Sequence, residues 1–277
     1  MISNSNKSIH QNYGTYLNLS IQQQLSIEKV QEHRQSIIHK TCNIIGQQEI
    51  SNAAIRTIKK YTNVLVDDKH KLLYCYIPKV GCTSWKVKLA LMSNFAKDTV
   101  FNTHPSPVDT RDGLAKFHLQ MLSTYAPSQI RYRIHNYFKF MIARHPLERV
   151  VSSYRSKWER RKDNKVEFPW FYNRFGPEIR KCCRKNNSDK DSDITFHEFV
   201  EYLIYKSHLS GMDDHWERFY NICHNCMIDY DYVGKFETMR DDTAYLLREI
   251  SDNEGDYWFP NVTKPRSASK YLQKYYS

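Results

Sequence analysis

The pattern of polar and apolar residues changes near residue 60. Residues 1–60 are rich in Gln, Asn and Ser, and apolar positions follow a helical spacing only in places, as at Ile21, Leu25 and Val30. Residues 61–277 contain apolar runs with strand and helix periods, separated by turns. We therefore predict a polar N-terminal stalk or loosely packed helices over 1–60, followed by one folded domain over 61–277.

The folded part opens with a predicted pair of strands and a helix. Residues 63–78, NVLVDDKHKLLYCYIP, predict two short strands joined by a polar turn at 67–69. A helical spacing follows at Trp85, Leu89 and Met92. The chain between these two patterns is a tight loop.

Two later segments repeat the order of strand, loop and helix. YFKFMIAR, residues 137–144, predicts a strand, and Pro146 stands at a suitable first position of a helix. YDYVGKFE, residues 230–237, predicts a third strand, with a helix beginning near Thr238. The charged residues between them, 159–193, predict an excursion over the surface.

This repeated order is typical of a parallel sheet flanked by helices, so we predict an α/β fold. Ligands of such folds bind beyond the carboxyl ends of the strands. The loops 78–84 and 144–146 each follow a predicted strand directly. We expect both loops at that edge of the sheet.

The net charge of +11 favours an anionic partner, which could be a nucleic acid, an acidic polysaccharide, a nucleotide or a membrane surface. Solubility alone would explain the same surplus. The sequence contains no nucleic-acid recognition motif, so we predict no nucleic-acid partner. No apolar run reaches the roughly 18 residues of a membrane-spanning helix, and no signal-peptide pattern is visible. The oligomeric state is not indicated.

The seven cysteines include the motif CHNC at Cys223–Cys226. A zinc site would need a second pair of ligands at a suitable spacing, which is missing, and we predict no metal. In an oxidising compartment disulfides are expected instead, although the spacing does not assign the partners.

The segment YIPKVGCTSWK, Tyr76–Lys86, has features of a phosphate site. A helix N-terminus offers unpaired N–H groups and a partial positive charge. Gly81 would let the backbone approach a ligand closely, and Lys79 would add a full charge. An ordinary helix start with a Ser or Thr cap explains the same residues. The Walker pattern is absent, which disfavours a magnesium-dependent nucleoside triphosphatase.

The segment ARHPLERVVSSYRSKW predicts a second anion site. Arg144 would emerge at a strand end and could hold a phosphate through two hydrogen bonds. Ser152, two helical turns further, could donate to the same group. Alternatively, Arg144 pairs with Glu148 and Ser152 is an ordinary surface serine.

These two segments, together with HWERFYNICHNCMIDYDYVGKFETMRDDTAYLL at 215–247, resemble three motifs of Golgi carbohydrate sulfotransferases. The most similar group contains the chondroitin 4-O-sulfotransferases and the HNK-1 sulfotransferase. The resemblance implies a P-loop-like sulfotransferase fold for residues 61–277 and the donor 3′-phosphoadenosine 5′-phosphosulfate. By similarity, the donor-binding residues are Pro78, Lys79, Val80, Gly81, Cys82, Thr83 and Ser84 at the 5′-phosphosulfate, and Arg144, His145, Pro146, Leu147, Glu148, Arg149, Val150, Val151 and Ser152 at the 3′-phosphate.

The resemblance also implies an enzyme that transfers a sulfuryl group to a hydroxyl of an anionic glycan. The acceptor expected first is the 4-hydroxyl of N-acetylgalactosamine in chondroitin or dermatan. Three alternatives stay open: a glucuronate of the HNK-1 type, an N-glycan N-acetylgalactosamine, and a non-catalytic protein that binds glycan or nucleotide.

Two residues are expected to act in catalysis. Lys79 would stabilise charge on the leaving phosphate, and a histidine would take the proton of the attacking hydroxyl. His118 is favoured as this base because similar enzymes have a histidine between the two cofactor loops. His215, in the third motif, is the alternative.

The resemblance predicts the Golgi lumen or membrane as the location. Similar enzymes have an N-terminal signal anchor and a further C-terminal helix, and this sequence shows neither. An incomplete gene model and a genuinely short form would both explain the difference.

Overall fold

The computed structural model describes residues 14–46, 51–61, 63–93, 111–159, 169–184, 193–207, 212–251, 258–260 and 268–276. The chain folds into two compact units. The first comprises Met1–Ala143 and Arg218–Pro265, and the second comprises Arg144–Glu217 and Arg266–Ser277.

The first unit is built on a five-stranded sheet with the strand order β4-β2-β3-β5-β6. The strands are β2 (Val64–Asp67), β3 (Leu72–Cys75), β4 (Leu119–Met121), β5 (Phe138–Ala143) and β6 (Tyr232–Lys235). β5 runs parallel to both β3 and β6, whereas β2 is antiparallel to β3 and β4. The predicted α/β fold is confirmed, and the parallel arrangement holds for the three strands from which the predicted strand–loop–helix segments start.

The predicted turn between the first two strands is confirmed at residues 68–71. The Asp67 carboxylate accepts hydrogen bonds from the backbone N–H groups of Lys69 and His70, at 3.1 and 3.2 Å. Lys71 completes the reversal with a left-handed φ of 53°. Because β2 and β3 are buried at every position, this hairpin lies in the core of the unit.

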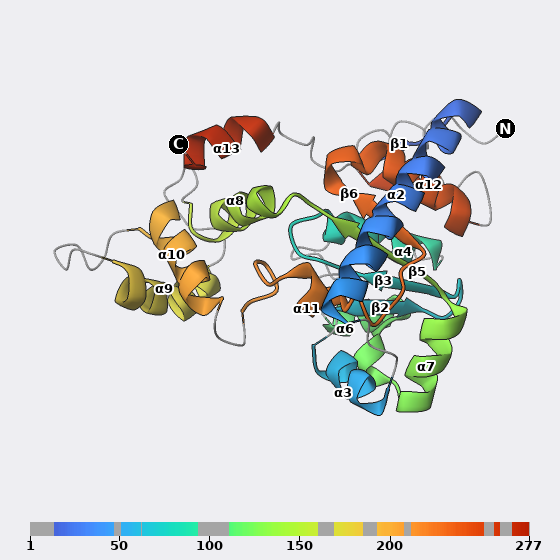
Figure 1. The fold of residues 1–277 in the computed structure, drawn as a ribbon, viewed down its shortest axis with the longest axis horizontal. Coiled ribbons are helices and arrows are strands. Elements are labelled where there is room, and N and C mark those ends of the chain that lie inside the picture. Colours follow the sequence, from blue (N-terminus) through green and yellow to red (C-terminus); the bar gives the residue numbers. More distant parts are fainter. Residues whose placement is uncertain are drawn as a thin grey trace. The chain divides into compact units, whose positions relative to one another are not determined.

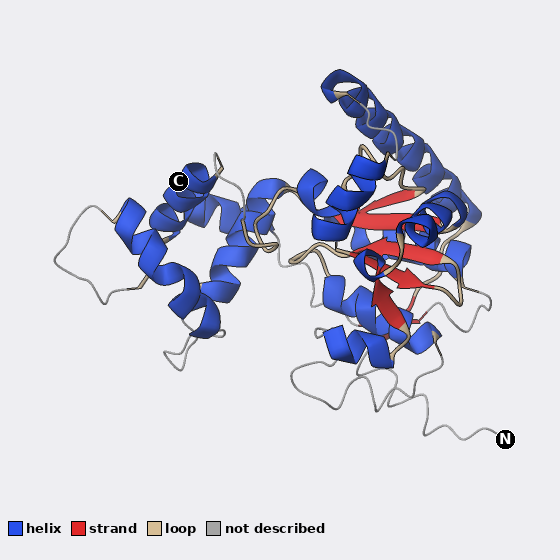
Figure 2. Cartoon of the chain, turned by 90° about the horizontal axis from the view of Figure 1, so that it is seen from below, coloured by secondary structure: helices blue, strands red, loops and turns tan. Residues whose placement is uncertain are grey.

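Helices flank the sheet (Figures 1 and 2). None of the described helices combines the length and the apolar content needed to cross a membrane. The first unit also contains a small antiparallel pair, β1 (Gly14–Tyr16) with β7 (Trp258–Pro260). Its helices are α2 (Ile21–Ile45), α3 (Asn52–Tyr61), α4 (Cys82–Met92), α6 (Arg111–Lys116), η2 (Leu122–Thr124), α7 (Pro127–Asn136), α11 (Phe219–Cys223), η3 (Phe236–Thr238) and α12 (Met239–Ile250).

The long helix α2 lies alongside β6 and α12 (Figure 1). Gln31 exchanges two hydrogen bonds of 3.1 Å with the backbone of Val233. Arg34 donates to the buried Asp242 carboxylate at 2.6 Å, and the Tyr232 hydroxyl donates to the same oxygen at 2.8 Å. This polar network joins α2 to the third predicted strand. The division of the chain at residue 60 stays a prediction.

The second unit is helical and has its own aromatic core. It contains α8 (Pro146–Lys157), α9 (Pro169–Cys183), α10 (Phe196–Lys206) and α13 (Ala268–Tyr276). Trp158 and Phe199 are completely buried between these helices. The prediction of a surface excursion over 159–193 is wrong for α9, because Phe171 and Ile179 of this helix are buried in the same core.

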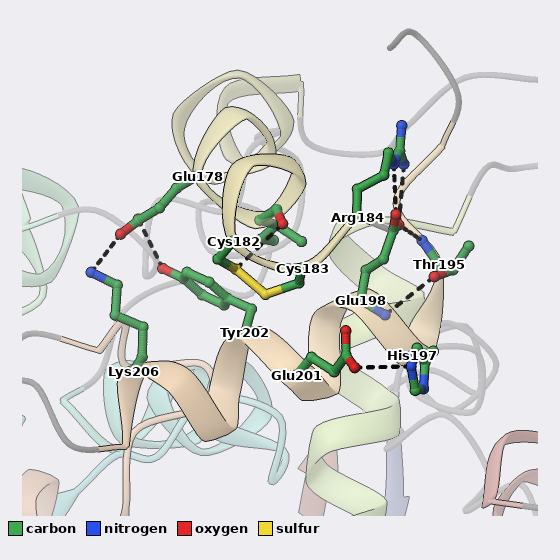
Figure 3. The surroundings of a disulfide bond; sticks show 11 residues. Glu178, Cys182, Cys183, Arg184, Thr195, His197, Glu198, Glu201, Tyr202 and Lys206 are labelled. Atoms are coloured by element: carbon green, nitrogen blue, oxygen red, sulfur yellow. Dashed lines mark hydrogen bonds and ion pairs between the residues drawn. A yellow bond between two sulfur atoms is a disulfide. The ribbon is translucent and has the colours of Figure 1, made fainter. Parts of the chain in front are cut away.

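Adjacent cysteines at the end of α9 form a disulfide, Cys182–Cys183 (Figure 3). Arg184, the next residue, makes a buried ion pair with Glu198 at 2.6 Å. Glu198 also accepts a hydrogen bond from the backbone N–H of Thr195, while the Thr195 hydroxyl accepts one from the N–H of Glu198. These contacts hold the end of α9 against the start of α10.

Candidate active site

The loop that connects β3 to α4 is held firmly in the first unit. Ile77 and Val80 are completely buried, and Pro78 is buried as well. Cys75, the last residue of β3, forms a disulfide with Cys223 of α11. The polar and small residues 81–84 are exposed or half-buried. The loop thus presents its polar positions on a fixed base.

The backbone of this loop has two left-handed residues, Lys79 with φ of 72° and Gly81 with φ of 84°. A non-glycine residue in this region costs of order 1–3 kcal/mol, and such strain clusters at ligand sites. A Cβ atom on Gly81 would come within 2.6 Å of the Met239 side chain, so the loop also packs tightly.

The N-terminus of α4 suits an anion. The helix is 11 residues long, and its first turn contains no acidic residue. The N–H groups of that turn have no partner within the helix, and the helix dipole adds a partial positive charge. Lys79, Thr83 and Ser84 could supply further donors. The residues predicted for the 5′-phosphosulfate therefore form one continuous segment with the features of an anion site.

α4 contains two lysines that were not among the predicted residues. Lys86 is buried, and its ammonium lies 4.1 Å from the centre of the Tyr76 ring. Lys88 is buried too. A helical period in the sequence assigns polar residues such as these lysines to the solvent-exposed side. Because residues 85–90 are buried all round the helix, that pattern could not identify the two lysines as buried.

The second predicted loop begins where β5 ends. β3 and β5 are parallel, with Cys75 opposite Met141, so their carboxyl ends share one edge of the sheet. Arg144 follows Ala143, the last residue of β5, and belongs to the second unit. There its Nε lies 3.4 Å from Glu148, in the local pair expected as the alternative to phosphate binding. An arginine has five N–H donors in a planar fork, a geometry that matches a phosphate as well as a carboxylate.

The remaining residues predicted for the 3′-phosphate lie at different depths. His145, Pro146 and Leu147 are exposed, Val150 and Ser152 are half-buried, and Arg149 and Val151 are buried. Arg149 donates to the backbone carbonyls of Asp214 and, at 2.6 Å, Glu217. Its guanidinium is therefore engaged with the protein.

The turn that Arg149 holds contains an imidazole–carboxylate pair. His215 Nδ1 lies 2.6 Å from Asp213 Oδ1, and the His215 backbone N–H donates to the same oxygen at 3.0 Å. Burial of the Asp213 carboxyl raises its pKa, but the hydrogen bond and charge of His215 outweigh this and hold the pKa below its ordinary value.

His118 lies in the turn before β4, is exposed and has a left-handed φ of 57°. Its neighbour Leu119 pairs with Asp67, which pairs with Leu72 at the start of β3. His118 is therefore at the amino-terminal edge of β3, whereas the loop 78–84 follows the opposite end. This position argues against His118 as the base, and its role stays a prediction.

The CHNC motif is divided between two disulfides. Cys223 is bonded to Cys75, and Cys226 to Cys42 of α2. Among the described residues, Cys82 is the free cysteine, and no cluster of His, Cys, Asp and Glu could hold a metal ion. The disulfides fasten the end of β3 to α11, and α2 to the turn that follows α11.

Comparison with known proteins supports the resemblance. Carbohydrate sulfotransferase 11 of Rattus norvegicus is 35% identical over 208 residues, which are 73% of this chain and 56% of that protein. Carbohydrate sulfotransferase 14 of Danio rerio is 32% identical over 250 residues, or 85% of this chain and 63% of the relative. Carbohydrate sulfotransferase 9 of Homo sapiens is 32% identical over 247 residues, or 88% and 52%.

The chain thus spans between about half and two thirds of the length of these relatives. No solved structure matches it. A profile described as the sulfotransferase family matches residues 62–276, which include both candidate loops and the His215 turn. From this match and the identities above, the chain belongs to the sulfotransferase family.

Proposed function

We propose that this protein is a carbohydrate sulfotransferase that uses 3′-phosphoadenosine 5′-phosphosulfate as its donor. The observation that carries the proposal is the loop 78–84. The chain belongs to the sulfotransferase family, and in it this loop follows a parallel strand and contains Lys79 and Gly81 with left-handed φ. The loop leads into a helix whose first turn has no acidic residue. The relatives named above are all carbohydrate sulfotransferases.

In this proposal, residues Pro78–Ser84 bind the 5′-phosphosulfate, and residues of the segment Arg144–Ser152 bind the 3′-phosphate. By similarity to the family, Arg144 and Ser152 are the proposed direct ligands of the 3′-phosphate, and Arg149 of the same segment donates to the backbone carbonyls of Asp214 and Glu217. Lys79 stabilises charge on the bridging oxygen and leaving phosphate during transfer. By analogy with phosphoryl transfer, positioning and charge stabilisation supply most of the catalysis.

The proposed acceptor is the 4-hydroxyl of N-acetylgalactosamine in chondroitin or dermatan. The net charge of +11 suits an anionic polysaccharide. Another glycan acceptor of the same enzyme group, and binding of glycan or nucleotide without transfer, are the competing proposals.

We further propose that the protein works in the Golgi lumen, in line with the family resemblance. Three disulfides among the described residues suit an oxidising compartment.

A transfer assay with ³⁵S-labelled donor and a panel of desulfated glycans tests the function. We expect label in desulfated chondroitin, and disaccharide analysis should locate the sulfate at the 4-position. Label in a different glycan would keep the enzyme class and replace the acceptor. Glycan binding with no transfer to any acceptor would instead support a non-catalytic protein.

A further inference from the structure

The turn 213–217 of the second unit contains a close pair of titratable groups, Asp213 and His215. Its Asp213 and His215 side chains are 20% and 25% exposed, so solvent or a ligand can reach them although both are largely enclosed. Two hydrogen bonds join them, one from the imidazole and one from the backbone N–H of His215. The carboxylate therefore fixes both the ring and the backbone of the histidine.

The contact also fixes the tautomer. An ionised carboxylate can only accept hydrogen bonds, so Nδ1 of His215 must carry the hydrogen that Asp213 accepts. In a neutral imidazole the other nitrogen, Nε2, then has the lone pair that can take a proton. An acidic residue in this position also stabilises the imidazolium formed afterwards.

An aromatic side chain limits the movement of the ring. The Phe171 ring meets the His215 ring edge to face, with 4.9 Å between the centroids. Lys157, itself buried, has its ammonium 4.0 Å from the centre of the Phe171 ring. Burial, which raises the pKa of Asp213, and His215, which lowers it, have the larger effects. The charge of Lys157 lowers this pKa by a smaller amount. These contacts favour one orientation of the His215 ring in a partly apolar setting.

The turn is fastened to α8, the helix of the proposed 3′-phosphate ligands. Arg149 donates to the backbone carbonyls of Asp214 and Glu217, and the Ser153 hydroxyl donates to the carbonyl of His215 at 2.6 Å. Arg149 and Ser153 are four residues apart, so they lie on one side of the helix. Ser152 is the direct neighbour of Ser153. The same helix that is proposed to bind the donor thus holds the imidazole in position.

We infer that His215 is the catalytic base that takes the proton of the acceptor hydroxyl, and that Asp213 is its positioning residue; this inference rests on the proposed function. As the acceptor oxygen forms its bond to sulfur, the bond between sulfur and the bridging oxygen breaks. The electron pair of that bond leaves with the 5′-phosphate of the nucleotide, and the hydroxyl proton moves to Nε2 of His215. Charges and atoms balance without a metal or a redox partner.

The experiment compares six variants in the ³⁵S transfer assay with desulfated chondroitin as the probe. His215→Ala should lower kcat by about 10²–10⁴-fold, the usual contribution of a general base. Its affinity for adenosine 3′,5′-bisphosphate, measured by calorimetry, should equal that of the unaltered protein. His118→Ala tests the competing assignment of the base in the same assay. His197→Ala is the matched control, because His197 also pairs with a carboxylate, Glu201 at 3.1 Å, but is 71% exposed on α10.

Asp213→Asn separates a positioning role from a structural one. It should lower kcat without raising KM for donor or glycan, and combining it with His215→Ala should cost no more than His215→Ala alone. Added imidazole should restore part of the activity of His215→Ala and none of the activity lost in Lys79→Ala.

Four results would overturn the inference. Unchanged kcat in His215→Ala would exclude this residue as the base while the proposed function stands. A loss of kcat in His118→Ala with intact nucleotide affinity would return the role to His118. Fully additive losses in the Asp213→Asn and His215→Ala double variant, with no rescue by imidazole, would show a structural role only. Absence of transfer by the unaltered protein would overturn the proposed function, and the inference with it.

Discussion

Removal of the disulfide between Cys75 and Cys223 should destabilise the first unit and loosen the loop 78–84. This bond joins the last residue of β3 to α11, and both cysteines are completely buried. We consider the variant Cys75→Ala/Cys223→Ala, which leaves no unpaired thiol at either position. The other disulfide of this unit, Cys42–Cys226, stays intact.

The expected magnitude follows from the length of the loop that the bond closes. The two cysteines are 148 positions apart, which alone would give about 5 kcal/mol of chain-entropy stabilisation. The Cys42–Cys226 bond already provides a covalent path of about 36 residues between them. A loop of that length gives about 4 kcal/mol. At about 2–4 °C per kcal/mol, the melting temperature of the first unit should fall by about 8–16 °C.

Differential scanning calorimetry of the variant and of the unaltered protein measures this loss. The control is Cys182→Ala/Cys183→Ala, which removes a bond between adjacent residues in the second unit. A ring of about two residues gives only about 1 kcal/mol in the same treatment. If the two variants lost equal unfolding free energy, the loop-length argument would be refuted.

Four further predictions concern the proposed donor site and two buried ion pairs. Arg144→Ala should weaken binding of adenosine 3′,5′-bisphosphate by about 10–100-fold, which is the contribution of a charge-assisted hydrogen bond. Glu148→Gln breaks the ion pair of Arg144 with Glu148 but should keep the affinity, and calorimetry measures both variants. Lys79→Ala should lower kcat by about 10²–10³-fold and change donor affinity less; a pure affinity effect would contradict its role. Asp242→Ala removes the carboxylate partner of Arg34 and should cost about 3–5 kcal/mol in urea unfolding, and a loss below about 1 kcal/mol would contradict a buried ion pair. Burial raises the pKa of Glu198, but the hydrogen bonds of Arg184 and Thr195 outweigh it and depress the pKa in the folded protein. Its stabilisation is therefore present at neutral pH and lost as the pH falls through that depressed value, so Glu198→Gln should reduce the acid dependence of unfolding in this range.

Much of the sheet could be predicted from local sequence because its strands are short apolar runs next to clear breaks. The turn at 67–69 and the strands β3, β5 and β6 follow this rule. The segment of α9 could not be predicted in the same way. Its apolar residues Phe171 and Ile179 are separated by charged ones, and they become buried only because α8 and α10 supply a second core.

The candidate site also has parts that local sequence indicates and parts that depend on tertiary contacts. The loop proposed to bind the donor could be proposed from the sequence because a strand, a glycine, a lysine and a helix start are adjacent there, and each contributes locally. The base could not, because the sequence offers twelve histidines and the features that distinguish one of them are tertiary. For His215 these are the Phe171 ring and the backbone carbonyls held by α8, which add to the local pair with Asp213. For His118 the deciding feature is the antiparallel register of β4, which sets it at the amino-terminal edge of β3.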